Sequence, residues 1–533
     1  MNRLPALFDA NGRFGSSSSQ TPVFPRPKDL LAHLDRLGVD RALVWNTEAA
    51  AGNCPLANRQ LLHRIARSPG ARGRLIPALA FSPTMLYERG AVQGLKKMLK
   101  GTGVPALRLP GTVSGPHTLR HTEPIIESIS AAHPTIFINN NDADGPDIAA
   151  LAEKFPSVSF ILTETMWPRY VFVFDLMRRC KNVLIESSWL HTMGAIELIA
   201  KEFGGDRIVF GLGDKSHNGA SIAALAHARI SRKEREMIAH GNMERLLRLK
   251  PAPARRAKKV AGRRDTLWSR LIQNKKLGVD IIDAHVHLGP GAGFVLEQQS
   301  MPGQISIALE GARTLGITTM LVSGAQALAG DPVAGNRMLE KQLRPYGRRF
   351  RGYFVFNPHY EKELRRGLDA FFAGGFFVGF KTLCDYWRVP ITDARFSAML
   401  QYADRHRLPI LNHTWTGPYD SPGMFNDIVK RYPGAMFLLG HSGGTDTGRR
   451  QAEELAASNH NVYLEWCGSF CSSIPWEETL AKVGADKVVY GSDGMSHGLA
   501  WELGRLLSVN LPDATIRPIL GDNIRRILAL RRA

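Results

Sequence analysis

The segment Ile281-Ile282-Asp283-Ala284-His285-Val286-His287 decides the fold, because the chain opens on the same framework with both histidines replaced. That earlier copy is Phe8-Asp9-Ala10-Asn11-Gly12-Arg13. In a β-strand, residues i and i+2 point to the same face, so His285 and His287 aim together. The later segment therefore predicts a strand that presents two imidazoles on one side, and the earlier copy predicts the same strand without them.

The repeat extends through the whole chain. Further pairs of segments match at a nearly constant offset: 137–140 with 411–413, 160–164 with 437–441, 182–186 with 461–465, 209–213 with 489–493, and 242–247 with 523–528. A period this long indicates a duplicated domain rather than a solenoid. We therefore predict one domain in residues 1–250 and a second in residues 278–533.

The stretch 251–277 between the two copies is rich in proline, alanine, lysine and arginine near its start, and we interpret it as an exposed basic linker. Within each copy, short apolar runs alternate with helical patterns, for example runs at 282–288 and 318–322 around a helical pattern at 305–312. Strands that are apolar throughout are typical of a parallel sheet buried on both faces. The predicted fold class is α/β, with two tandem (β/α)8 TIM-barrel-like domains.

The bulk composition excludes several classes of protein. A length of 533 residues suits two domains, and a hydrophobic content of 44% is ordinary for a globular protein. No apolar run is long enough to cross a bilayer, the start does not look like a signal peptide, and five scattered cysteines favour a reducing compartment, so we expect a cytoplasmic protein. The net charge is +20, yet residues 280–533 hold 27 Lys and Arg against 25 Asp and Glu. Without motif support beside this charge, we do not expect a nucleic-acid partner.

Metal-ligand side chains stand at matched strand ends in the second copy alone. Each follows an apolar run: His285, His287, His413, His441 and Asp493. Neutral imidazoles with one carboxylate suit a divalent ion, with Zn²⁺ favoured and Mn²⁺ or Fe²⁺ as alternatives. Three histidines and an aspartate would leave a position open for water or substrate, so the pattern predicts one catalytic metal ion.

These motifs resemble the amidohydrolase superfamily, in the branch that contains aminocarboxymuconate-semialdehyde decarboxylase. The resemblance covers essentially all of residues 278–533 and lies in Asp283-Ala284-His285-Val286-His287, Gly440-His441-Ser442-Gly443-Gly444 and Gly491-Ser492-Asp493, among others. It implies that His285, His287, His413 and Asp493 bind the metal. It also implies that His441 is catalytic, and that Asp493 is both a ligand and the base.

Two further residues are candidates for binding the substrate. Lys381 has three interpretations that the sequence leaves open: an ammonium that pairs with a substrate carboxylate, a carbamate that bridges two metals, or a structural lysine. Trp415 stands near the predicted mouth, where it would line a pocket or pack at the rim.

The first copy departs at every one of these positions. Arginine cannot ligate a cation, glycine has no side chain, and amides are poor ligands. We therefore predict a pseudoenzyme domain, in which the replacements are Asn11, Arg13, Arg108, Asn139 or Asn140, Glu164 and Gly213. We expect this domain to act as a partner of the second domain in an internal pseudo-dimer. The sequence leaves open whether the chain also assembles into a homo-oligomer.

The predicted function is hydrolysis of an amide, lactone or ester bond in a small molecule through a metal-activated water, and the sequence leaves open whether the substrate is anionic. One alternative is non-oxidative decarboxylation of a small aromatic or unsaturated carboxylic acid, because the same ligands serve both reactions. A second is a binding protein with a vestigial site. The retention of all five metal-ligand residues in one copy, when the other lost every one, argues against that second alternative.

Overall fold

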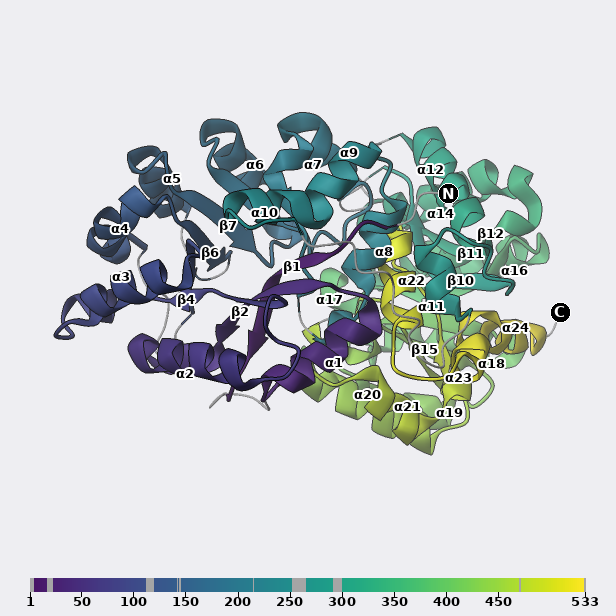
Figure 1. The fold of residues 1–533 in the computed structure, drawn as a ribbon. Coiled ribbons are helices and arrows are strands. Elements are labelled where there is room, and N and C mark those ends of the chain that lie inside the picture. The colour runs from purple at the N-terminus through teal and green to yellow at the C-terminus, as the bar shows by residue number, and fades with distance from the viewer. Residues whose placement is uncertain are drawn as a thin grey trace. The chain divides into compact units, whose positions relative to one another are not determined.

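The computed structural model describes residues 4–16, 23–111, 119–140, 142, 145–213, 215–251, 265–290, 300–468 and 471–531. The chain divides into two compact units (Figure 1). Unit 1 comprises Met1–His191 and Ala195–Arg264, and unit 2 comprises Thr192–Gly194 and Asp265–Ala533.

Unit 2 contains an eight-stranded parallel sheet in which the strands follow one another in chain order. Its strands are β10 (Ile281–Leu288), β11 (Ile317–Gly324), β12 (Phe350–Val355), β13 (Phe377–Thr382), β14 (Pro409–His413), β15 (Met436–Gly440), β16 (Val462–Glu465) and β17 (Val488–Val489). The N–H of Ala284 in β10 donates to the carbonyl of Tyr490, just beyond β17, at 3.0 Å. This bond joins the first strand to the last, so the predicted α/β barrel class is confirmed.

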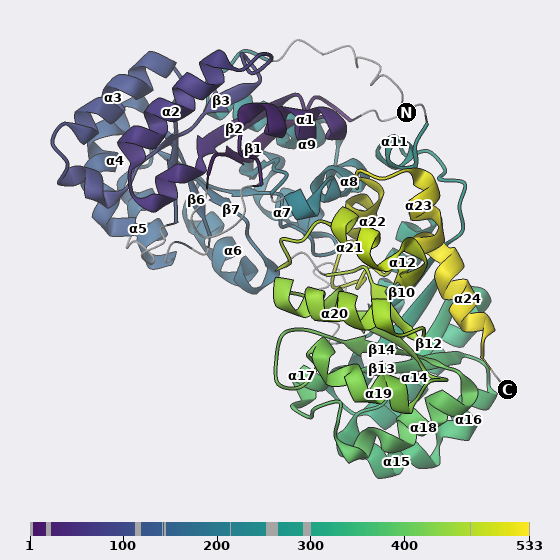
Figure 2. The ribbon, with the colours of Figure 1, turned by 90° about the horizontal axis from the view of Figure 1, so that it is seen from below.

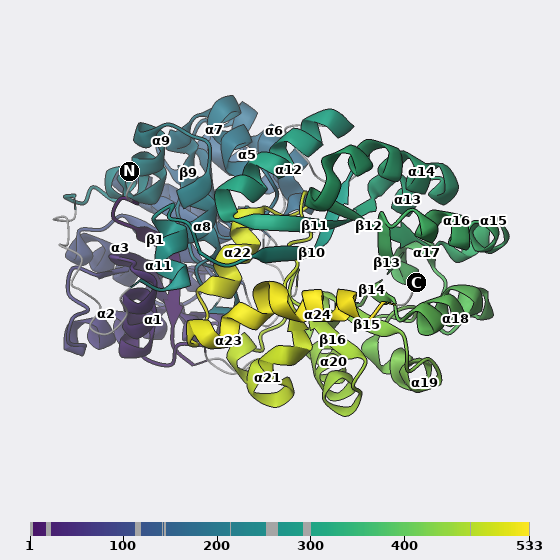
Figure 3. The same cartoon turned by 90° about the vertical axis from the view of Figure 1, so that its right-hand side faces the viewer.

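Helices follow the strands of unit 2 and form its outer layer, with α24 across one end (Figure 3). They are α11 (Leu267–Ile272), α12 (Met301–Leu315), α13 (Ala325–Ala329), α14 (Pro332–Leu343), α15 (Glu361–Arg366), α16 (Leu368–Ala373), α17 (Cys384–Trp387), α18 (Ser397–His406), α19 (Asn426–Arg431), α20 (Asp446–Ser458), α21 (Trp476–Val483), α22 (Leu499–Leu507), α23 (Asp513–Arg517) and α24 (Asn523–Ala529).

Unit 1 has the same strand order, divided into a three-stranded and a six-stranded parallel sheet. The strands are β1 (Phe8–Phe14), β2 (Arg41–Asn46), β3 (Leu75–Pro77), β4 (Leu79–Ala80), β5 (Ala106–Leu109), β6 (Thr135–Asn139), β7 (Ser159–Thr163), β8 (Val183–Glu186) and β9 (Ile208–Val209). The division falls at Ala78, directly after Pro77, whose nitrogen has no hydrogen to donate to a ladder. The N–H of Ala10 donates to the carbonyl of Phe210 at 2.8 Å, which matches the closing bond of unit 2.

Helices also cover the strands of unit 1, as α2, α3 and α4 do in Figure 2. They are α1 (Pro27–Leu37), α2 (Cys54–Arg67), α3 (Ala91–Thr102), α4 (Glu123–Ile129), α5 (Gly145–Lys154), α6 (Tyr170–Arg179), α7 (Ala195–Phe203), α8 (Ala220–His227), α9 (Arg232–Glu236) and α10 (Asn242–Leu246).

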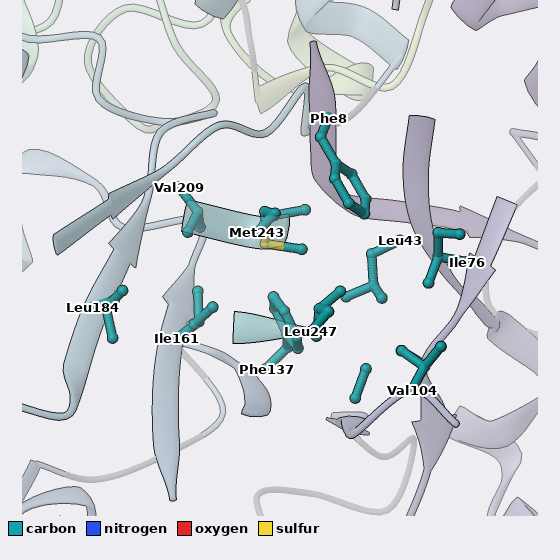
Figure 4. Packing of buried hydrophobic residues seen from close by; sticks show 13 residues of the cluster. Phe8, Leu43, Ile76, Val104, Phe137, Ile161, Leu184, Val209, Met243 and Leu247 are labelled. Carbon is teal, nitrogen blue, oxygen red and sulfur yellow. The ribbon is translucent and has the colours of Figure 1, made fainter. Parts of the chain in front are cut away.

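The cores of the two units are built alike, from one apolar side chain of nearly every strand and from the last helix. In unit 1, Met243 and Leu247 pack against residues such as Phe8 and Phe137 (Figure 4). In unit 2, Ile524 and Ile527 of α24 pack in the same way against residues such as Ile282. Packing therefore explains why the segments 242–247 and 523–528 match in sequence, since each contributes to the core of its own unit.

Buried asparagines explain other matched positions. The amide of Asn336 donates to the carbonyl of Val355 and accepts its N–H, both at 3.0 Å. Asn58 makes the same two bonds with Ala80, at 2.8 and 2.7 Å. The remaining pairs also donate to backbone carbonyls in both units: Asn182 with Asn461, and Asn242 with Asn523.

The predicted linker 251–277 contains a folded element. Its residues 252–264 lie outside the described part of the chain, but α11 forms in unit 2 with Leu267 and Leu271 buried. Two leucines four residues apart give this short helix an apolar face. The prediction missed it because the basic residues before it dominate the composition of the stretch. Within the described residues, no helix is long and apolar enough to span a membrane.

We expect Asn336→Ala to destabilise the protein by about 2 to 4 kcal/mol, because two buried backbone groups of Val355 lose their partner. Urea unfolding measures this loss. Asn426→Ala is the matched control, since Asn426 is exposed and its side chain donates to the carbonyl of Gly423 on the surface, and it should change stability by less than about 0.5 kcal/mol. Equal effects of the two substitutions would contradict the anchoring role.

Candidate metal centre

The side chains predicted to bind a metal lie at the carboxyl ends of the unit 2 strands, which is the catalytic end of such barrels. His285 and His287 lie on β10, and His413 is the last residue of β14. His441 directly follows β15, and Asp493 lies a few residues beyond β17. Consecutive parallel strands thus bring together residues that are more than two hundred positions apart in the sequence.

Three of these side chains converge on one point. The Nε2 atoms of His285 and His287 lie 3.1 Å apart, and Oδ1 of Asp493 lies 3.0 Å from His287 Nε2 and 3.7 Å from His285 Nε2. Ligand atoms that share one ion at bond lengths of about 2.1 Å are themselves separated by about 3 to 3.5 Å. The donor set, two imidazoles and a carboxylate, and its spacing therefore suit a divalent transition metal.

His413 and His441 lie beside this group. The ring of His441 lies 5.3 Å from that of His285 and 4.9 Å from that of His413, measured between centroids. Among the described residues, His285, His287 and Asp493 form one close set of donor atoms, and His285, His441 and Cys467 form a second. His413 belongs to neither set, so the structure places this predicted ligand next to the converging atoms and not among them.

The outer ring nitrogens of three histidines are held by neighbouring acceptors. Each Nδ1 contacts an oxygen of another strand or loop: His285 with Glu465 at 3.0 Å, His287 with Ser323 at 2.8 Å, and His413 with Asp420 at 2.6 Å. A partner at Nδ1 fixes the ring and directs Nε2 toward the centre, as in most protein metal sites. This arrangement supports all three histidines as potential ligands.

Burial keeps the imidazoles neutral, which is the form that binds a cation. It lowers the pKa of His285 and of His441 well below the usual value, and it lowers that of His287 against the opposing bond to Asp493. Burial acts to raise the pKa of Asp493, but the hydrogen bond from His287 and the electrostatic influence of the neighbouring His285 and His497 outweigh it and hold this pKa well below its usual value. The centre thus combines neutral imidazoles with an ionised carboxylate.

Lys381 and two aromatic residues surround the centre. Nζ of Lys381 lies 2.7 Å from His285 Nε2, and burial lowers the pKa of this lysine. Trp415 is stacked near His413, with ring centroids 6.3 Å apart, and Tyr386 meets the same ring edge-on at 5.6 Å. The side chain of Tyr386 is largely exposed, so it lies on the open side of the centre.

Backbone conformation marks the same positions in both units. His441 has φ 63° and Asp493 has φ 51°, in the left-handed region that most residues avoid. Their counterparts Glu164 and Gly213 have φ 59° and 71°. The turns that carry the candidate catalytic residues were therefore kept in the copy that lost the side chains.

At the corresponding centre of unit 1, the side chains bond to one another. Glu164 accepts from Arg13 at 3.0 Å, from Asn11 at 3.1 Å and from Asn139 at 2.7 Å. Arg108 donates to Asn11 at 3.4 Å, as Lys381 contacts His285 in unit 2. A guanidinium thus occupies the centre where unit 2 gathers metal-ligand atoms.

Strand register resolves one alternative left by the sequence. Asn139 pairs with Thr163, the residue before Glu164, and His413 pairs with Gly440, the residue before His441. Asn139 is therefore the counterpart of His413, and Asn140 is not.

The sequence reasoning missed several residues at this centre. Glu465, fully buried, contacts His285 Nδ1 and the N–H of His441, and its counterpart Glu186 was visible in the repeat without a role. Cys467 Sγ lies 3.1 Å from His285 Nδ1 and contacts Glu465. Ser188 makes the same contact with Glu186 in unit 1, so this contact belongs to the shared scaffold. The partners Ser323 and Asp420 have no sequence signal, because neither belongs to a recognisable motif.

The sequence profile of a family described as Amidohydrolase matches residues 9–249 and 282–530, so one profile matches the chain twice. No curated protein matches. Similar solved structures include an uncharacterized TIM-barrel protein from Bordetella bronchiseptica (14% identity, 47% of this chain and 99% of that one, TM-score 0.39). Others are a dihydroxybenzoic acid decarboxylase from Polaromonas with manganese and an inhibitor (16%, 48% and 98%, 0.36) and a putative amidohydrolase from Staphylococcus aureus (14%, 47% and 100%, 0.37).

Glu186 in unit 1 should make stability depend on pH. Burial raises its pKa from 4.5 to about 8, against hydrogen bonds from Ser188 that lower it. The protonated carboxyl therefore contributes stability that is complete below about 4.5 and is lost as the pH rises through about 8. Within that window we expect the free energy of unfolding to fall by up to about 1.4 kcal/mol per pH unit.

Glu186→Gln, which is neutral at every pH, should flatten this dependence in urea unfolding between pH 6 and pH 9. Glu153→Gln, at an exposed glutamate of the same unit, should keep the wild-type slope. A Glu186→Gln protein whose stability still falls as steeply as that of the wild type would contradict the assignment.

Proposed function

The chain belongs to the amidohydrolase family, whose profile covers most of it, and on that premise we propose that unit 2 is a metal-dependent hydrolase of a small amide, lactone or ester. The observation that carries this proposal is the convergence of His285, His287 and Asp493 on one point. These three residues would hold one divalent ion, with His413 beside them as the fourth ligand. Zn²⁺ is favoured by the donors, and Mn²⁺ and Fe²⁺ are the alternatives.

A bound ion would supply Lewis acidity and lower the pKa of a water molecule. The side chains provide the rest. Asp493, ionised and beside the converging atoms, would take the proton of the attacking water on its carboxylate. His441 would bind the substrate oxygen through Nε2, since its Nδ1 lies toward Cys467, 3.6 Å away.

Unit 1 would then be a non-catalytic copy, in line with predicted domains at residues 1–250 and 278–533. Its centre holds a guanidinium in place of ligand atoms, because Arg13 donates to Glu164. The charge of this cation opposes binding of a metal ion, and unit 1 also lacks the ligands, because Asn11, Asn139 and Gly213 take their positions.

One observation favours decarboxylation as a second candidate. Lys381 places a buried cationic group beside His285, and Trp415 and Tyr386 offer flat apolar surfaces near His413. The cation would pair with the carboxylate of an aromatic acid, and the flat side chains would pack against its ring.

We expect purified protein to bind about one divalent ion per chain, and His285→Ala to lose it together with turnover, because the converging donor set is broken. Asp493→Asn should lower kcat by about 10²- to 10⁴-fold through loss of the proton acceptor. Elemental analysis and steady-state kinetics measure both effects. Arg13→Ala, in unit 1, is the control and should leave metal content unchanged; a change there, or full activity of His285→Ala, would contradict the proposal.

Lys381→Met distinguishes the two reactions. For a hydrolase of neutral lactones, amides or esters, the substitution should change KM by less than about threefold, because no substrate charge is paired. For a decarboxylase, KM for the carboxylic acid should rise by about tenfold or more, and CO₂ should be the product. A screen of lactones, amides, esters and aromatic carboxylic acids, read by acid release and by CO₂ release, identifies which outcome holds.

A further inference from the structure

A row of buried polar side chains runs from Asp493 into helix α22. Nε2 of His497 lies 3.8 Å from Oδ2 of Asp493, and its Nδ1 bonds with Oε1 of Glu502 at 3.0 Å. Arg505 donates to Oε2 of Glu502 at 3.1 Å. Glu502 and Arg505 have no exposed side-chain surface. The row therefore joins a candidate ligand to the interior of the outer helix layer.

Glu502 also reaches the other side of the centre. Its Oε1 accepts the N–H of Gly468 at 3.1 Å. A Cβ at Gly468 would lie 2.4 Å from His441 Nδ1, so this backbone is pressed against the His441 ring. The carboxylate of Glu502 therefore contacts both His497, which lies beside Asp493, and Gly468, which lies against the ring of His441.

Stability alone does not explain this arrangement. Removing a carboxylate and a guanidinium from water costs several kcal/mol per ion, and apolar residues of similar size often serve equally well or better. Arg505 is further committed to the interior, since it donates to the carbonyl of Trp466 at 2.6 Å and lies over the Trp466 ring. Charged groups held at such cost are most simply explained by something that they orient.

Unit 1 provides the internal comparison. The helix that corresponds to α22 is α8, with the sequence ASIAALAH, which contains neither a carboxylate nor a guanidinium. The counterpart of Asp493 is Gly213, and His217 lies close enough that its Nδ1 would be 3.0 Å from a Cβ at that glycine. The histidine was kept in both units, whereas the ion pair behind it occurs only where the carboxylate of Asp493 is present.

We propose that Glu502 is a positioning residue for the reaction of unit 2, which holds the carboxylate of Asp493 and the imidazole of His441 at a fixed separation through His497 and Gly468. This inference rests on the proposed function, because it takes Asp493 as a metal ligand and His441 as the substrate-binding group. Glu502 itself does not touch the converging donor atoms. Its influence reaches them through one side chain and one backbone amide.

The test uses Glu502→Gln in the full-length chain, with a matched control at Glu453→Gln. Glu453 is also a buried helical glutamate in unit 2, with Thr479 donating to it at 2.6 Å and Arg449 3.9 Å away, but the metal centre is not among its contacts. Both substitutions remove one buried charge and keep the side-chain shape. They therefore share any general effect on stability.

We expect Glu502→Gln to weaken binding of Zn²⁺ and of Mn²⁺ by about 10- to 100-fold in competition with a chelator, as is usual when support of a ligand is lost. With the site saturated, kcat should fall by a similar factor, while KM changes by less than about threefold. Glu453→Gln should bind both ions within about twofold of the wild type, and its kcat should be unchanged.

Ion affinity and kcat of Glu502→Gln within twofold of the wild type, or equal losses in Glu453→Gln, would overturn the positioning role. A wild-type chain that takes up neither ion would instead remove the proposed function on which it rests. Should Glu502→Gln fail to fold, His497→Asn carries the same measurements, because it breaks the link to Asp493 and leaves the pair of Glu502 and Arg505 in place.

Discussion

The buried carboxylate of Glu465 is the interaction on which the candidate centre depends. Oε2 bonds with His285 Nδ1 at 3.0 Å and accepts the N–H of His441 at 3.2 Å, and Oε1 accepts the N–H of Cys467 at 2.9 Å. One side chain therefore fixes an imidazole of the centre, the left-handed turn that carries another, and the loop behind both. A Cβ at Gly491, just beyond β17, would lie 2.0 Å from Oε1, so only glycine fits at this position beside the carboxylate.

Unit 1 keeps the corresponding buried glutamate, Glu186, although it lacks the imidazoles that Glu465 contacts in unit 2. Oε2 of Glu186 accepts the N–H of Glu164 at 3.3 Å and the amide of Asn11 at 3.5 Å, and Ser188 donates its hydroxyl to the same carboxylate. These partners correspond one by one to those of Glu465, and a Cβ at Gly211 would lie 1.9 Å from its Oε1. The carboxylate is thus part of the shared barrel scaffold, while the imidazoles that it orients in unit 2 are specific to the centre.

The repeat in the sequence predicted the barrel class and the convergence of His285, His287 and Asp493, because strand alternation and strand order fix which side chains meet. It could not rank His413 below these three, since that depends on where the imidazole ring is placed at the end of its strand. It could not choose between Asn139 and Asn140, which needed the register of β6 with β7. Glu502 lay beyond sequence reasoning altogether, because nothing near it marks a buried helical glutamate as a partner of Gly468 and His497.

The two units solve the same electrostatic problem in different ways. Both gather acidic or acceptor groups at the strand ends, and such groups need a cation when water is excluded. Unit 1 supplies that cation covalently, since Arg13 donates to Glu164. In unit 2 the position of Arg13 is occupied by His287, a neutral imidazole whose Nε2 lies 3.0 Å from Oδ1 of Asp493. On the proposed function, this exchange together with the other ligand replacements transfers the role of the cation from a side chain to a bound ion, so folding and metal binding become coupled in unit 2 and stay independent in unit 1.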